Sequence, residues 1–143
     1  MKAVYIDTSF VLSFLFAEQG SDDYKAYWDA THLRFSSILL QAETLVALHR
    51  HKVRVDVWRF MDSLMKAVQF RILDERITAR IRADRKFGRL RSLDAIHLAT
   101  ACEIRDAIQE PIEIACLDSR LRDSATTFGF VLLPRRDRKE AGE

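Results

Sequence analysis

The sequence predicts an α/β sandwich in which helices cover a mainly parallel β-sheet. Short apolar stretches rich in Val, Ile and Phe alternate along the chain with longer helical patterns, which is typical of this class. The first stretch, KAVYI, lacks the polar–apolar alternation of a half-buried strand, so both of its faces are expected to be buried. Only four Gly and two Pro residues occur, and long loops are therefore not expected.

The first half of the chain is expected to form two strands with helices between them. Phe10, Leu12 and Phe14 suit a short helix after the turn that follows the first strand, and Ser21 or Asp22 is a candidate N-cap for the next helix. The Leu- and Ala-rich stretch SSILLQAETLVALHRH indicates a third helix. The expected elements are a strand at 2–6, helices at 9–17, from 22, at 36–51 and at 55–67, and a short strand at 68–73.

The second half is expected to repeat this alternation. A basic helix is predicted first, then a loop around Gly88 and a long helix with Ser92 as its N-cap. Pro111 ends the loop that follows, and Gly129 ends the last helix. The expected elements are helices at 75–86, 92–107 and 120–127, and strands at 112–117 and 130–133.

Length and composition indicate one domain over 1–134, followed by a polar tail at 135–143. Apolar residues make up 48% and charged residues 31% of the chain, as in ordinary globular proteins. Cys102 and Cys116 lie in apolar segments without metal-ligand spacing, so buried free thiols in a reducing cytoplasm are expected. No stretch is long enough to span a membrane, and Asp7 interrupts the apolar N-terminal run, which argues against a signal peptide.

Four acidic residues stand at positions where a parallel α/β fold binds ligands. Asp7 and Asp118 end predicted strands, and ligands of such sheets bind outside the carboxyl ends of the strands. Glu43 is the only charged residue between Ser36 and Leu48, on or beside an apolar stripe. Asp94 lies in the first turn of its helix. Each acid also has an ordinary structural explanation. Asp7 and Asp118 can cap the helices that follow them, Asp94 can interact favourably with the helix dipole, and Glu43 can lie at the edge of the apolar stripe and reach water.

Taken together, the acids point to a metal site. Carboxylates gathered in one cleft repel one another, and a hard cation such as Mg²⁺ or Mn²⁺ removes that conflict. The corresponding chemistry is metal-assisted hydrolysis of a phosphodiester. Between Arg76 and Arg91 the chain has seven basic residues and one acid, a surface suited to nucleic-acid phosphates, although solvated helix faces are the ordinary explanation of such runs.

Four segments resemble the PIN-domain ribonucleases, and among them the VapC-type toxins of prokaryotic toxin–antitoxin pairs. The matching segments span nearly the whole chain in the family's order, and LRSLDAIHLATA is the most specific part. They are VYIDTSFVLSFLF, SSILLQAETLVALHR, RLRSLDAIHLATA and IACLDSRLRDSATTFGFVLL. The resemblance implies a three-layer α/β/α sandwich, endonucleolytic cleavage of RNA and dependence on Mg²⁺ or Mn²⁺.

The resemblance also implies roles for individual residues. Asp7 and Asp94 match the principal metal ligands, Glu43 matches the acid that completes the metal shell or orients the water, and Asp118 matches the late acid. Ser9 and Ser92 are capping hydroxyls that can support a neighbouring carboxylate. The partners implied are RNA, a second copy of the chain and a small antitoxin whose basic side chain approaches the acids. The residues expected to contact RNA are Arg85, Arg89 and Arg91.

One feature departs from the family pattern, and one alternative function stays open. Some relatives place a second acid close to the late Asp, whereas Ser119 and Arg120 follow Asp118 here, which puts a two-metal scheme in doubt. A haloacid-dehalogenase-type phosphatase would need an acid at Ser9, and a response-regulator receiver would need an acidic pair and a late Lys. The open alternative is a binding module of the same fold that holds RNA or protein without cutting.

Overall fold

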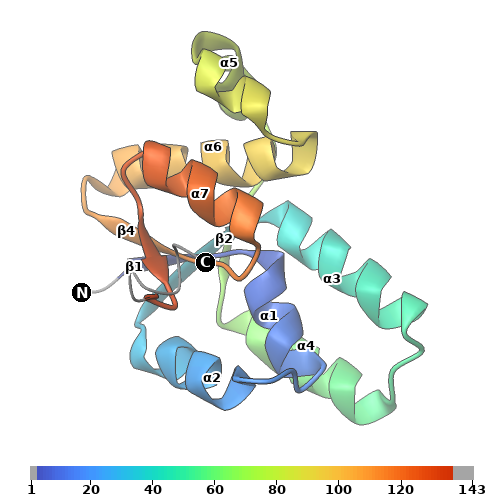
Figure 1. Ribbon diagram of the computed structural model, residues 1–143. Helices are drawn as coiled ribbons and strands as arrows, with labels where there is room; N and C mark the ends of the chain where they lie inside the picture. The colour runs from blue at the N-terminus through green and yellow to red at the C-terminus, as the bar shows by residue number, and fades with distance from the viewer. Residues whose placement is uncertain (1–2, 137–143) are drawn as a thin grey trace.

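Five parallel strands form a single sheet at the centre of the molecule. The computed structural model describes residues 3–136 (Figure 1). The strands are β1 (Ala3–Ile6), β2 (Leu33–Ser37), β3 (Gln69–Arg71), β4 (Ile112–Ala115) and β5 (Val131–Leu133), in the spatial order β3-β2-β1-β4-β5. Every neighbouring pair is parallel, with Ala3 opposite Leu33 on one side of β1 and opposite Ile112 on the other. β1 is therefore the central strand.

Helices cover both faces of this sheet, so the α/β/α sandwich is confirmed. In Figure 1, α6 and α7 lie on one side of the strands, with α5 outside α6, and α1 to α4 lie on the other. The helices are α1 (Thr8–Leu15), α2 (Ser21–Ala30), α3 (Ile38–Arg50), α4 (Val55–Lys66), α5 (Glu75–Ala83), α6 (Ser92–Ile108) and α7 (Ser119–Thr127), with a 3₁₀ helix, η1 (Arg85–Arg89), between α5 and α6.

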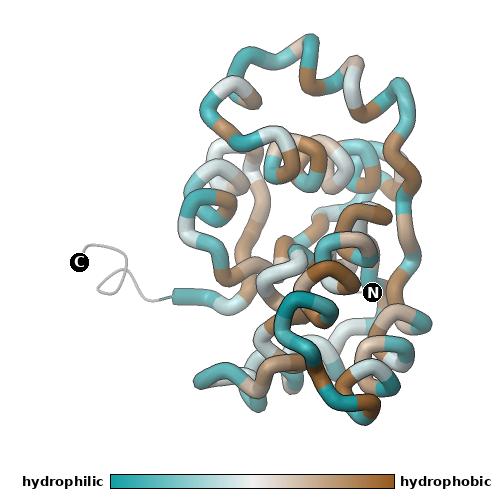
Figure 2. Tube along the Cα trace, turned by 90° about the vertical axis from the view of Figure 1, so that its right-hand side faces the viewer, coloured by the Kyte–Doolittle hydropathy of each residue, from teal (hydrophilic) through white to brown (hydrophobic). Residues whose placement is uncertain are grey.

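The strand β1 supplies side chains to two separate hydrophobic cores. Ala3 and Tyr5 point to the core beneath α6, whereas Val4 and Ile6 point to the core formed with α1, α3 and α4. This alternation follows from the two-residue period of a strand, and it explains why the KAVYI stretch has no polar face. In Figure 2 hydrophobic stretches run through the middle of the molecule and hydrophilic ones alternate around the outer helices.

The strand β2 is absent from the sequence prediction, which placed a helix from residue 36 onward. Its sequence, LRFSS, contains Arg34 and ends on two Ser residues, so it lacks the apolar run that marks a buried strand. Both Ser residues are buried because their hydroxyls have partners. Ser36 donates to the carbonyl of Ile6 at 2.6 Å, and Ser37 accepts from the amide of Leu39 at 3.1 Å as the N-cap of α3.

Several predicted boundaries also differ. The basic helix predicted at 75–86 ends at Ala83, because the side chain of Asp84 starts η1 by accepting from the amide of Lys86. Ser92 is the first residue of α6 and not its cap, which is Arg91 without a side-chain capping bond. The cap of α2 is Gly20 rather than Ser21 or Asp22. β4 ends at Ala115, so Asp118 lies three residues beyond the strand.

The remaining expectations concern the cysteines, the tail and membranes. Cys102 and Cys116 are buried and free, as predicted. The tail predicted at 135–143 falls largely on residues 137–143, which lie outside the described residues. Among residues 3–136, no helix is both long and apolar enough to cross a membrane.

Candidate active site

The four predicted acids come from four separate segments that meet at the carboxyl edge of the sheet. Asp7 directly follows the central strand β1, and Asp118 follows its neighbour β4. Glu43 lies in α3, which begins directly after β2, and Asp94 lies in the first turn of α6. The pKa of Asp94 is raised, first by burial and then by the negative charges of the other three acids. The four carboxyl groups are thus close enough to influence one another.

Asp7 is almost fully buried, and one of its oxygens is held by the protein. Its Oδ2 accepts from the amide of Ser9 at 3.1 Å and from the Ser9 hydroxyl at 2.5 Å, as the N-cap of α1. The thiol of Cys116 donates to the same oxygen at 3.4 Å. The Ser9 hydroxyl in turn accepts from the amide of Leu117 at 2.9 Å, which ties the start of α1 to the loop after β4. The carboxylate is therefore fixed in orientation.

Glu43 is held by two donors from different elements. Its Oε1 accepts from the hydroxyl of Thr8 at 2.9 Å and from Nε2 of His97 at 2.6 Å. Burial alone would raise the pKa of Glu43, but the hydrogen bond and charge of His97, together with Thr8, outweigh burial and lower it. The carboxylate that stands beside an apolar stripe in the sequence is thus kept ionised by a buried histidine.

His97 is itself held from behind by Tyr5. The imidazole is 2% exposed, and its Nδ1 lies 2.7 Å from the hydroxyl of Tyr5, which also accepts from the amide of Ser37 at 3.2 Å. Burial opposes protonation of His97, but the hydrogen bond to Glu43 and the charges of Asp7 and Glu43 raise its pKa. His97, one turn after Asp94 in α6, is therefore both packed in the core and hydrogen-bonded. No sequence signal pointed to Tyr5, because it occupies an ordinary position in a strand.

Asp94 and Asp118 are less constrained than Asp7 and Glu43. Asp118 is exposed, and its Oδ1 accepts from the amide of Leu121 at 3.0 Å as the N-cap of α7. Asp94 is half-buried and its side chain makes no hydrogen bond to residues 3–136. Ser92, predicted to support this acid, likewise makes no capping bond. Asp94 is therefore the acid whose carboxylate is most free to turn.

These carboxylates have few neighbouring cations, and several of their oxygens make no hydrogen bond to the described residues. Asp7, Asp94 and Asp118 form no ion pair with Lys or Arg in the described part of the chain, and Glu43 pairs with His97 alone. In each of Asp7, Glu43 and Asp118 the hydrogen bonds fall on one oxygen, and the other oxygen has no hydrogen-bond partner among residues 3–136. Such hard oxygens suit Mg²⁺ or Mn²⁺. Within residues 3–136, however, no three His, Cys, Asp or Glu side chains are positioned to hold a metal ion together.

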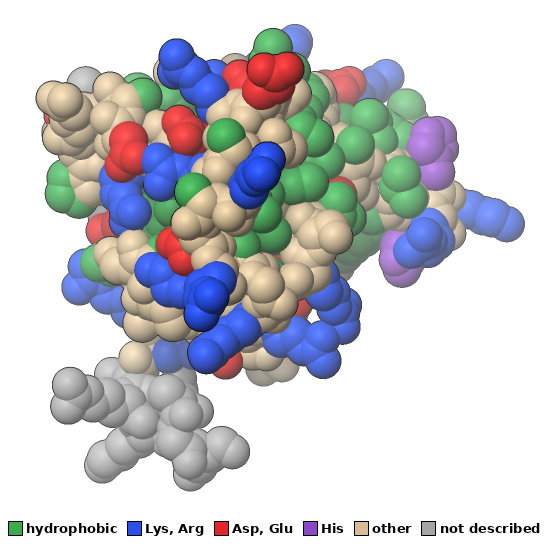
Figure 3. Space-filling model, turned by 90° about the horizontal axis from the view of Figure 1, so that it is seen from above, with side chains coloured by type: hydrophobic (Ala, Val, Ile, Leu, Met, Phe, Trp, Pro, Cys, Tyr) green, Lys and Arg blue, Asp and Glu red, His purple; other side chains and the backbone are tan. Residues whose placement is uncertain are grey.

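The predicted RNA contacts lie next to this edge. Arg85 and Arg89 belong to η1, and Arg91 caps α6 three residues before Asp94. All three side chains are exposed. Figure 3 looks down on the face that α5 and α7 cover and shows Lys and Arg side chains distributed over it, with acids between them.

A mainly apolar groove of about 510 Å³ opens on the other side of Glu43. Its walls come from α1, α3 and the start of α6, and its most exposed apolar side chains are Val46 and Leu93. Glu43 and Arg50 are the charged residues among those that line it. The groove therefore combines a mainly apolar lining with one carboxylate and one guanidinium.

Comparisons with known proteins agree with this arrangement. The model of the PIN domain family matches residues 4–125. Ribonuclease VapC46 from Mycobacterium tuberculosis is 31% identical over 138 residues, which cover 93% of this chain and 98% of that protein. A chain of a toxin–antitoxin complex from Klebsiella pneumoniae has the same fold, with a TM-score of 0.63 and 22% identity over 82% of this chain and 88% of that chain. The chain described here belongs to the PIN domain family.

Proposed function

We propose that the chain is a metal-dependent endoribonuclease that hydrolyses RNA phosphodiester bonds at Asp7, Glu43, Asp94 and Asp118. The observation that supports this most is the group of carboxylate oxygens at the carboxyl edge of the sheet that have no hydrogen-bond partner in the described part of the chain. They occur in a member of the PIN domain family that is 31% identical to a ribonuclease. The proposed cofactor is one Mg²⁺ or Mn²⁺ ion.

Each acid has a distinct part in this proposal. Asp7 and Asp94 are the principal ligands, one rigid and one free to turn toward a cation. Glu43 lies at the same edge, and His97 keeps its carboxylate ionised. In this proposal the carboxylate orients the attacking water or accepts a proton from it. Asp118 adds a fourth negative charge, which favours binding of a cation. The cation, when bound, supplies the Lewis acidity that activates water and offsets the charge of the phosphodiester.

We further propose that the chain is the toxin of a toxin–antitoxin pair in the cytoplasm, where RNA is found and the two buried thiols stay reduced. The relatives named above include a VapC ribonuclease and a chain from a toxin–antitoxin complex. The groove beside Glu43 suits an amphipathic antitoxin segment whose basic side chain reaches the carboxylate. Exposed apolar residues of α3, Ile38, Leu45 and Val46, are candidates for contact with a second copy of the chain.

The test is cleavage of a total RNA pool by the purified chain. We expect cutting with Mn²⁺ or Mg²⁺, none with a chelator, and none with Asp94→Asn. The matched control is Asp62→Asn, which removes the same charge from an exposed position on α4 and should cut like the parent. Melting temperatures measured with and without Mn²⁺ report binding separately, because a ligand of the folded state raises the melting temperature.

Two results would contradict the proposal. Equal cutting by the parent and by Asp94→Asn would mean that Asp94 only stabilises the first turn of α6, or that a contaminant cleaves the RNA. RNA binding without cutting, in protein shown to be free of antitoxin, would favour the non-cleaving module instead.

A further inference from the structure

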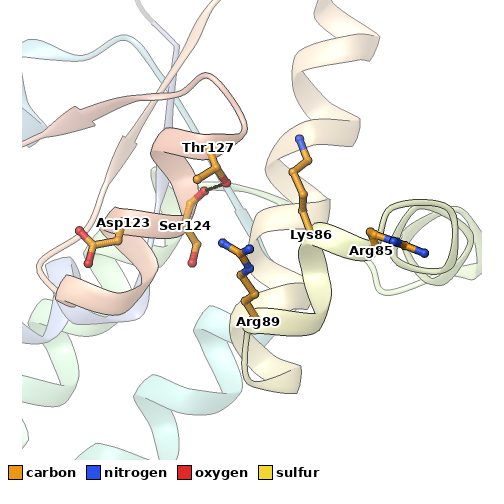
Figure 4. Close-up of a pocket in the computed structure, with 6 residues that line it drawn as sticks. All are labelled: Arg85, Lys86, Arg89, Asp123, Ser124 and Thr127. Atoms are coloured by element: carbon orange, nitrogen blue, oxygen red, sulfur yellow. Dashed lines mark hydrogen bonds between the residues drawn. The ribbon is translucent and has the colours of Figure 1, made fainter.

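A basic pocket of about 530 Å³ lies between η1 and α7, outside the site formed by the acids. Figure 4 shows its lining side chains: η1 provides one wall and α7 the other. The lining residues are Arg85, Lys86, Arg89, Asp123, Ser124 and Thr127. Three of the six are cations on a single short helix, so the pocket has a cationic wall facing a wall that carries two hydroxyls.

Two of the three cations have no partner in the described part of the chain. Arg85 and Arg89 make no hydrogen bond, ion pair or ring contact with residues 3–136. In contrast, the ammonium of Lys86 lies 3.7 Å from Asp84 Oδ2 and 4.4 Å from the centre of the Phe128 ring. Figure 4 shows the Arg89 side chain extending across the pocket toward Ser124. Arg89 is therefore the guanidinium best placed to bind a ligand there.

The opposite wall offers a hydroxyl to the same ligand. The hydroxyl of Thr127 is already used, since it donates to the backbone carbonyl of Ser124 at 2.7 Å. The hydroxyl of Ser124 makes no hydrogen bond with the described residues. Asp123 lines the same wall, and in Figure 4 its carboxylate points away from Arg89. A guanidinium facing a free hydroxyl is a suitable pair of donors for the oxygens of a phosphate group.

Both walls of the pocket are close in sequence to proposed metal ligands. Arg89 precedes Asp94 by five residues, and α7 begins at its cap, Asp118. Ser124 follows Asp118 by six residues, which is about 9 Å along a helix axis at 1.5 Å per residue. A single RNA strand can therefore contact the pocket and the proposed site at the same time.

We propose that this pocket binds a backbone phosphate of the RNA strand a few nucleotides from the bond that is cut. This proposal rests on the ribonuclease function proposed above. Arg89 holds the phosphate through paired N–H donors, and Ser124 donates its hydroxyl. The pocket reads no base, because it presents its donors to the backbone alone. It offsets the repulsion between the acidic site and the strand on which that site acts.

The first test measures binding of a fluorescent single-stranded 20-nucleotide RNA by anisotropy, with every variant placed in an Asp94→Asn background so that no cutting interferes. We expect Arg89→Gln to weaken binding by about five- to tenfold, the loss expected for one charge-assisted contact. Asp123→Asn, which removes an acid from the same pocket, should tighten binding. The matched control is Arg59→Gln, an exposed and unpaired arginine on α4, across the sheet.

Salt dependence and RNA length sharpen the test. The logarithmic salt slope of binding should fall by about 0.7 in Arg89→Gln, as expected when one phosphate contact of a single strand is lost, and stay constant in Arg59→Gln. When the RNA is shortened from either end, the difference between the parent and Arg89→Gln should disappear once the strand on one side of the cut is too short to reach the pocket. Equal affinities of Arg89→Gln and Arg59→Gln would overturn the proposal.

Failure of this proposal and failure of the ribonuclease function give different results. If the pocket holds a phosphate, Arg89→Gln in the otherwise unchanged chain raises the KM for RNA and leaves kcat at its parental value, because no reacting atom is touched. If the chain cuts RNA but Arg89→Gln has the parental KM, only the pocket proposal fails. If the parent does not cut and the affinity differences persist, only the nuclease proposal fails. Loss of antitoxin binding with unchanged RNA affinity would assign the pocket to an acidic protein segment.

Discussion

Nε2 of His97 lies 2.6 Å from Oε1 of Glu43, and the pKa of each group is shifted so as to favour the charged pair. The imidazole is buried, whereas the carboxylate side chain is 30% exposed. The pair therefore connects the hydrophobic core under α6 with the open edge of the sheet. Tyr5, on the central strand, fixes the far side of the imidazole at 2.7 Å. The orientation of Glu43 thus depends on residues that never meet the solvent.

Removal of the imidazole is expected to destabilise the fold and to release Glu43. His97→Leu leaves the Tyr5 hydroxyl and the carboxylate without their partner, at a cost of about 1–3 kcal/mol in the free energy of unfolding. Urea unfolding at neutral pH measures this cost. His97→Gln, which keeps a side-chain donor, should recover part of it. Equal stability of His97→Leu and the parent would mean that the pair contributes nothing net, as some buried ion pairs do.

The stability contributed by this pair should depend on pH in both directions. The pKa of Glu43 is lowered from 4.5, so its contribution is present above about pH 4.5 and is lost as the pH falls through the folded value. The pKa of His97 is raised from 6.5, so its contribution is complete below about pH 6.5 and is lost as the pH rises through the folded value.

The difference in unfolding free energy between the parent and Glu43→Gln should consequently be largest between about pH 4.5 and 6.5 and smaller on both sides. Urea titrations of both proteins at a series of pH values provide the measurement. A difference that keeps rising at alkaline pH would contradict the charged pair.

Asp94 is expected to reduce stability while it serves the proposed chemistry. Its pKa is raised from 3.8 by burial and by the neighbouring acids, so its ionisation above that pH acts against folding. In the presence of a chelator, Asp94→Asn should therefore melt somewhat higher than the parent, and the difference should be small because solvent screens the charge of a half-buried group. Addition of Mn²⁺ should reverse the order, because only the parent keeps the full set of ligands. Asp62→Asn controls for net charge.

Asp7 has two roles that different substitutions can separate. As the N-cap of α1 it accepts from the amide of Ser9, and an Asn side chain can do the same. Asp7→Asn should accordingly keep most of the stability but lose RNA cleavage. Asp7→Ala should lose cleavage and, in addition, about 0.5–2 kcal/mol of unfolding free energy. If both variants unfold at the same urea concentration, the capping bond contributes little.

Two serines that begin helices should respond differently to the same substitution. Ser37 is buried and caps α3 through its hydroxyl, so Ser37→Ala should lower the free energy of unfolding by about 1 kcal/mol. Ser92 is exposed and makes no capping bond, so Ser92→Ala should change stability by less than about 0.5 kcal/mol. Urea unfolding of the two variants side by side measures the difference. A large loss for Ser92→Ala would restore the capping role that the sequence predicted.

Sequence patterns predicted the sandwich and most of its helices because apolar periodicity follows directly from burial. They could not reveal β2, since its two buried Ser residues acquire partners only when Ile6 and α3 are in place. The same holds for the site. Asp7 and Asp118 are visible as acids after strands, whereas the contribution of Tyr5 depends on how close His97 comes to it in the folded chain. Hydrogen-bond partners that are far apart in the sequence produce no periodic pattern from which they could be predicted.

The pairing of β1 with β4 has a consequence for how the chain is made. Asp7 is synthesised long before the strand that pairs with β1, in which Ala115 lies opposite Ile6. Asp118 and α7, one wall of the basic pocket, come later still. An unfinished chain on the ribosome therefore lacks both the strand that closes the site and the last of its acids. Under the proposed function, a nascent chain that does not yet include β4 and Asp118 is therefore not expected to cleave the RNA of the ribosome that makes it.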